Sequence, residues 1–152
     1  MTRPLPEQAA TLLDRFTDDV QEVVLHLREK VRAVAPNAHE TISDVGYTVS
    51  MRYGPDDKIG RAFCYIAGFS HHANLGSQSG SGLPDPERVF EGNGAQMRHI
   101  KFATVAQTHA PRLDGYLEAV LVQRGLDFRT GYRQSTTRLR PTGTSTRRRM
   151  TT

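Results

Sequence analysis

Three strand-like segments in the first half of the chain are joined by links too short to hold a helix, and this spacing constrains the fold more than any other feature. The first segment, residues 45–53, alternates apolar and polar residues as a half-buried strand does. Gly54-Pro55-Asp56-Asp57 has the composition of a turn, and segments 59–69 and 71–75 follow it. Because parallel neighbours need long crossover connections, the three segments predict an antiparallel meander.

Helical periodicity appears on both sides of these strands. Residues 6–34 place apolar side chains three or four positions apart, and Thr17 before Asp18 allows a new helix to begin within this segment. Residues 109–124 have the same periodicity and end at Gly125, a common helix terminator. The remaining predicted elements are a short helix over 84–90 capped by Asp85 and a strand over 97–102. Together these elements predict an α+β fold.

The positive charge is concentrated at the C-terminal end. The 152-residue chain has a formal net charge of +4, yet residues 129–152 contain seven arginines and no acidic residue. This segment has almost no apolar side chain to bury, so we predict one domain over 1–128 and a disordered Arg-rich tail over 129–152. Removing the tail should then leave stability unchanged. Any nucleic-acid binding should be weak, non-specific and due to the tail.

The cellular compartment follows from what the sequence lacks. Cys64 is the single cysteine, so no disulfide framework can form within one chain, and we expect it to be a small buried apolar residue. No apolar run approaches the length of a membrane span. We therefore predict a cytoplasmic protein with no membrane partner, either a monomer or a weak homodimer.

The densest group of chemically versatile side chains lies in the glycine-rich region after the second strand. Its candidate ligand-binding residues are His71, Asn74, Asp85, Arg98 and His99. An arginine can hold a carboxylate or phosphate through two hydrogen bonds, which makes Arg98 the candidate anchor. Because side chains alternate along a strand, Arg98 and His99 should point to opposite faces. The alternative is structural: Asp85 caps a turn, Arg98 pairs with a carboxylate, and the histidines lie on strand surfaces.

A second candidate site is acidic. Asp14, Asp18 and Glu22 are spaced four residues apart, so on a continuous helix they would share a face and could bind a hard cation such as iron. The alternative is a solvated helix face. The sequence contains no phosphate-binding loop, dinucleotide fingerprint, zinc-binding cysteine cluster or nucleophile elbow. We therefore assign no catalytic residue.

The segment GSGLPDPERVFEGNGAQMRHIKF, residues 80–102, resembles the YdhG-like family of small bacterial proteins, a domain of unknown function. Pro36-Asn37-Ala38 and the following Glu40-Thr41-Ile42-Ser43 are also similar to that family. The resemblance implies a curved antiparallel sheet of four to five strands, flanked by a long N-terminal helix and a C-terminal helix. It also implies a function, because some members are described as intracellular iron chaperones with a frataxin-like role.

Three functional hypotheses remain open. The first is a non-enzymatic binding protein for iron or a small anionic ligand. The second is an enzyme acting on a small polar substrate, with Arg98 as anchor and a histidine as acid or base. The third is an adaptor that binds nucleic acid or an acidic partner through the basic tail.

Overall fold

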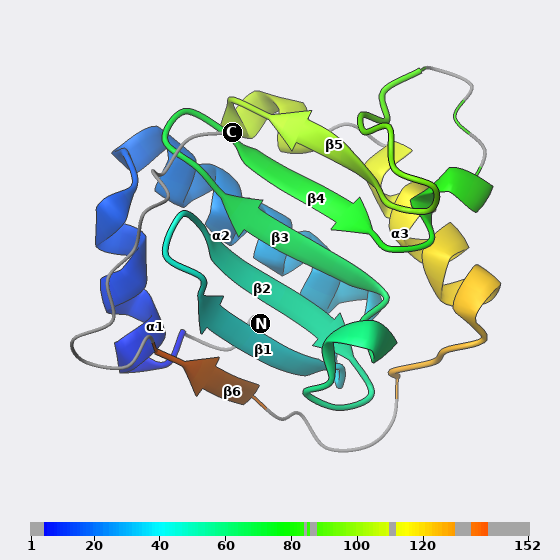
Figure 1. Cartoon of the computed structure of the whole chain (residues 1–152), viewed down its shortest axis with the longest axis horizontal. Helices are drawn as coiled ribbons and strands as arrows, with labels where there is room; N and C mark the ends of the chain where they lie inside the picture. The colour runs from blue at the N-terminus through cyan, green and yellow to red at the C-terminus, as the bar shows by residue number, and fades with distance from the viewer. Residues whose placement is uncertain (1–4, 84, 86–87, 110–111, 130–134, 140–152) are drawn as a thin grey trace.

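A six-stranded sheet with its helices packed on one face forms the protein (Figure 1). The computed structural model describes residues 5–83, 85, 88–109, 112–129 and 135–139. The strands are β1 (His39–Asp44), β2 (Val49–Gly54), β3 (Cys64–Gly68), β4 (Ala73–Ser77), β5 (Arg98–Phe102) and β6 (Ser135–Arg138). The α-helices are α1 (Glu7–Leu12), α2 (Asp18–Val34) and α3 (Arg112–Arg124), and short 3-10 turns cover Leu13–Arg15, Ile59–Arg61, Gly80–Gly82 and Val105–His109.

The strand order is β5-β4-β3-β2-β1-β6, and the first five strands are antiparallel neighbours. The predicted α+β class and meander are confirmed. The predicted four to five antiparallel strands are not, because the sheet is mixed: β6 runs parallel to β1. No helix in the part of the chain described above is long and apolar enough to cross a bilayer.

The first predicted strand begins too early. Residues 45–48 form the turn between β1 and β2, where the Val45 amide donates to the Thr48 carbonyl at 3.0 Å and Gly46 has a positive φ of 96°. That φ lies in the left-handed region that glycine adopts without strain. The strand before this turn, β1, was not predicted, because a glutamate occupies one of its inward positions.

The N-terminal helical segment is interrupted, as Thr17 allowed. The helix α1 ends in a 3-10 turn, and the Thr17 side chain accepts a hydrogen bond from the Val20 amide at 3.3 Å to cap the start of α2. The prediction of a short helix over 84–90 is wrong for the described part of that segment, because none of those residues is helical. Asp85 still caps a turn there, accepting from the amides of Val89 at 2.9 Å and Phe90 at 3.0 Å.

A buried ionic network joins α2 to the sheet. Glu40 of β1 is fully buried, and its carboxylate accepts two hydrogen bonds from Arg28, at 2.7 and 3.0 Å, and one from the Tyr53 hydroxyl at 2.7 Å. Arg32 approaches the same carboxylate to 3.3 Å and donates to the Ala38 carbonyl at 2.8 Å. These contacts bring two buried guanidinium groups to one buried carboxylate, and they explain how a glutamate can occupy an inward position.

The network changes the acid–base behaviour of its members. Burial alone would raise the pKa of Glu40, but the hydrogen bonds and charges of Arg28 and Arg32 outweigh it, so the pKa lies below its ordinary value of 4.5. Burial and the neighbouring Glu40 carboxylate raise the pKa of Tyr53 well above 10.0. Glu40 is therefore charged and Tyr53 is protonated at neutral pH.

The strand β6 corrects the predicted domain boundary. Ser135–Arg138, which the sequence placed in a disordered tail, pair with Glu40–Ser43 of β1. The Thr136 hydroxyl lies 2.8 Å from His39 Nε2, and Arg138 forms a 2.9 Å ion pair with Asp57. The rest of the predicted tail, residues 130–134 and 140–152, lies outside the described residues.

We expect a chain that ends after Arg129 to be less stable than one that ends after Leu139, by about 1–2 kcal/mol. Only the longer chain retains the hydrogen bonds of β6 to β1 and the Arg138 ion pair. Urea denaturation of the two chains measures the difference. Equal free energies of unfolding would show that β6 does not stabilise the fold, and would support a domain boundary at residue 128, as the sequence predicts.

Candidate functional site

The sheet face opposite the helices is the main candidate site. Apolar side chains on β1 to β5 point to the helices, so the residues between them point to the open face. The strand register aligns these outward residues in two rows: Thr41, Arg52, Tyr65, Gly76 and His99 in one, and Ser43, Ser50, Ala67, Asn74 and Lys101 in the other. Neither row contains an acidic residue, whereas arginine, lysine and histidine are all present.

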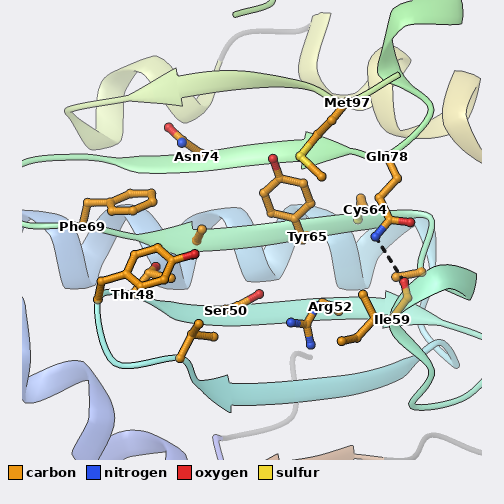
Figure 2. Close-up of a pocket in the computed structure, with 14 residues that line it drawn as sticks. Thr48, Ser50, Arg52, Ile59, Cys64, Tyr65, Phe69, Asn74, Gln78 and Met97 are labelled. Atoms are coloured by element: carbon orange, nitrogen blue, oxygen red, sulfur yellow. Dashed lines mark hydrogen bonds between the residues drawn. The ribbon is translucent and has the colours of Figure 1, made fainter. Parts of the chain in front are cut away.

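A groove of about 310 Å³ runs across this face (Figure 2). Its volume lies at the small end of the range for ligand pockets. Six of its fourteen lining residues lie in β2, β3 and β4, and the segments next to the strand ends supply the other eight. The lining residues are Val45, Tyr47, Thr48, Ser50, Arg52, Ile59, Ala62, Cys64, Tyr65, Ala67, Phe69, Asn74, Gln78 and Met97.

Arg52 is the cation of the groove. It donates a long hydrogen bond of 3.4 Å to the Ser43 hydroxyl, and no carboxylate in the described structure pairs with it. Burial and the nearby Arg138 guanidinium lower the pKa of Arg52 below its ordinary value of 12.5. An anion beside Arg52 would relieve both effects, because a positive charge that is partly desolvated and repelled by a like charge is stabilised by a negative one.

Tyr65 forms part of the upper wall of the groove in Figure 2. Its ring lies over Gly76 on the neighbouring strand: a Cβ at Gly76 would be 2.5 Å from the Tyr65 Cζ and hydroxyl oxygen. Any side chain at position 76 would displace the ring, so the glycine lets the Tyr65 side chain extend over β4. The Tyr65 hydroxyl makes no hydrogen bond to the described residues, and burial raises its pKa.

Two further lining residues, Asn74 and Cys64, differ in whether their side chains can take part in binding or reaction. Asn74 is only 8% exposed, and its Oδ1 has no hydrogen-bond partner in the described structure. Such buried polar atoms are uncommon, which marks Asn74 as a polar group with unused capacity. Cys64 is buried, as expected, and burial raises its thiol pKa well above 9.0, so it does not supply a thiolate nucleophile at neutral pH.

Among the sequence-predicted ligand-binding residues, Asn74 alone lines the groove. His71 is exposed in the turn before β4, and Asp85 caps the turn described above. His99 points to the open face of β5 beyond the groove, and burial lowers its pKa. The structure therefore does not bring these residues together in one cleft.

Arg98 occupies a different environment from the predicted anchor. It is half-buried and donates to two carbonyls of its own loop, those of Gly94 and Met97, the second at 2.7 Å. It packs closely on Gly80, where a Cβ would lie 2.6 Å from the Arg98 Cβ. These contacts hold the loop before β5 in place, and they involve neither Asp85 nor Glu91.

The acidic residues Asp14, Asp18 and Glu22 do not share one continuous helix. Asp14 lies in the 3-10 turn before the break at Thr17, whereas Asp18 and Glu22 lie in α2. All three are exposed. Across the described residues, no group of three or more histidine, cysteine, aspartate or glutamate side chains is placed to hold a metal ion.

The sequence alone did not identify Arg52, Ser50 or Tyr65. Alternation within residues 45–53 could have placed Ser50 and Arg52 on the outward face, but a polar outward face usually means solvent. Two features that only the structure shows distinguish this face from an ordinary solvated one. No α-helix packs on it in the described structure, and the sheet surface there forms a groove.

Comparisons with known proteins supply no relative for this chain: no family model, no curated protein and no solved structure matches it.

Proposed function

We propose that this protein is a non-enzymatic binding protein for a small carboxylate, which it holds in the groove on the open sheet face. Arg52 is the anchor. The observation that carries the proposal is a guanidinium that lines a groove, lacks a carboxylate partner and lies on rows of outward residues that contain no acid. Arginine binds carboxylates through paired, charge-assisted hydrogen bonds, so an anionic ligand satisfies this group best.

Two ligand classes are open from the sequence: iron, which the resemblance of residues 80–102 to the YdhG-like family implies, and a small anion, which the candidate arginine anchor implies. We place the anion first, because the groove contains a cation and the acidic residues considered for iron are exposed and divided by a helix break. Binding without turnover is favoured over catalysis because the groove lining contains no histidine and no carboxylate. General acid–base chemistry most often uses such groups near the reacting atoms.

Replacing Arg52 by glutamine is expected to weaken carboxylate binding at least tenfold. A hydrogen bond to a charged group contributes about 1.5–3 kcal/mol, and about 1.4 kcal/mol corresponds to a factor of ten in affinity. The test is an NMR titration of the full chain with a panel of small carboxylates, which gives dissociation constants for wild type and variant.

The matched control is Lys101→Gln. Lys101 is an exposed cation on the same sheet face, but it does not line the groove. Its removal changes the net charge as Arg52→Gln does, so a general electrostatic effect would weaken binding equally in both variants. That result, or unchanged binding in Arg52→Gln, would contradict the proposal.

A further inference from the structure

The outward side of β3, together with the residue that follows the strand, has a large-small-large pattern. Tyr65, Ala67 and Phe69 are two residues apart and point to the same face, all three lining the groove. A strand rises about 3.3 Å per residue, so the two aromatic residues are about 13 Å apart, with the alanine midway. Ala67 and Phe69 are buried, yet they do not belong to the apolar cluster that forms the core. Ala67 is thus the floor of a hollow between two rings.

Both rings are held in position by their neighbours. Phe69 stacks on His72, with ring centroids 5.0 Å apart and planes 20° from parallel. Tyr65 lies across Gly76, as described above. The hollow over Ala67 therefore has two aromatic walls that need not rearrange to receive a ligand, and preorganised walls lower the entropy cost of binding.

Polar groups close the hollow on its other two sides. Ser50 and Asn74 lie directly opposite Ala67 on β2 and β4. Two strand spacings place them about 9–10 Å apart. Ser50 supplies a hydroxyl group on one side, and Asn74 Oδ1 on the other has no hydrogen-bond partner among the described residues. Arg52 lies two residues along β2 from Ser50, within reach of a charged group on that ligand.

We infer that the ligand is an aromatic carboxylate, whose ring occupies the hollow over Ala67 and whose carboxylate pairs with Arg52. This inference rests on the proposed function and specifies its ligand class. Aromatic walls favour a planar ring, because offset and edge-to-face ring pairs are attractive beyond the area that they bury. The small volume of the groove limits the ligand to about one ring with short substituents.

Three probes separate the ring from the charge: benzoate, cyclohexanecarboxylate and acetate, each titrated into the full chain by NMR. Benzoate should bind at least fivefold more tightly than cyclohexanecarboxylate, which has the same charge and a similar size but no aromatic ring. Ala67→Leu should reduce benzoate affinity at least tenfold, because the larger side chain fills the hollow, and should leave acetate binding unchanged.

The control for Ala67→Leu is Ala10→Leu, the same substitution at an exposed position of α1. If Ala67→Leu does not fold, Ala67→Val tests the same hollow with a residue that suits a strand. Equal affinity for benzoate and cyclohexanecarboxylate, or unchanged benzoate binding in the variant at position 67, would overturn the inference while acetate binding at Arg52 still supported the proposed function. Absence of binding by all three carboxylates would overturn both.

Discussion

Replacing Glu40 by glutamine is expected to lower the free energy of unfolding by about 3–5 kcal/mol. The substitution keeps the shape of the side chain but removes the negative charge, so Arg28 and Arg32 remain buried without a compensating anion. The Tyr53 hydroxyl loses a charged acceptor at the same time. Small domains have free energies of unfolding of about 5–15 kcal/mol, so Glu40→Gln is expected to remove a large part of the total stability.

The control for this prediction is Glu29→Gln, which removes an identical charge from an exposed position of α2. Surface substitutions of this kind usually change stability by less than about 0.5 kcal/mol. Urea denaturation of the wild type and the two variants supplies the comparison. A loss below about 1 kcal/mol for Glu40→Gln would show that the carboxylate does not compensate the two arginines.

The same network should make the protein sensitive to acid. Because the folded-state pKa of Glu40 lies below its ordinary value of 4.5, the unfolded chain binds more protons than the folded chain between these two values. The stabilisation is therefore fully present above about pH 5 and is lost as the pH falls through the folded-state pKa. Protonation of Glu40 removes the negative charge that compensates the two buried guanidinium groups of Arg28 and Arg32.

Urea denaturation between pH 7 and pH 3 tests this dependence. The free energy of unfolding of the wild type should fall steeply below about pH 5, and Glu40→Gln should show a shallower fall, because its side chain has no proton to gain. Other carboxylates also titrate in this range, so the informative quantity is the difference between the two curves. Parallel curves would contradict the lowered pKa of Glu40.

Elements with a strong apolar period could be predicted from the sequence. The stripe of α2, the end of α3 at Gly125 and the strand β5 were all expected, and Gly125 adopts the positive φ of 65° typical of a helix terminator. In each case local spacing and a terminal residue determine the element, with no information needed from distant parts of the chain.

Two strands could not be predicted, because what stabilises them lies far away in the sequence. The strand β1 contains inward Glu40, whose partners Arg28 and Arg32 are on α2, and no local pattern signals that pairing. The strand β6 is short and polar, and its support comes from pairing with β1. The groove around Arg52 also depends on residues far apart in the sequence. The local pattern of glycines and histidines therefore indicated Arg98 as the anchor in place of Arg52.

The placement of the two arginines separates two kinds of role. Arg98 donates to carbonyls of its own loop, which is the way an arginine holds a turn in place. Arg52 lines a groove whose lining also includes Asn74, a residue with an unpartnered amide oxygen. On a scaffold of rigid strands, such a group is held in a fixed position without being neutralised, which is what recognition of an anion requires.

The most direct test of carboxylate binding at Arg52 is the NMR signal of its Nε–H group during a titration of the full chain with benzoate, assigned by its disappearance in Arg52→Gln. We predict a saturable shift of the Arg52 signal and no change in the Arg98 signal, which Arg98→Lys assigns in the same way. A shift of the Arg98 signal with an unchanged Arg52 signal would contradict the account and place the anchor at the loop before β5.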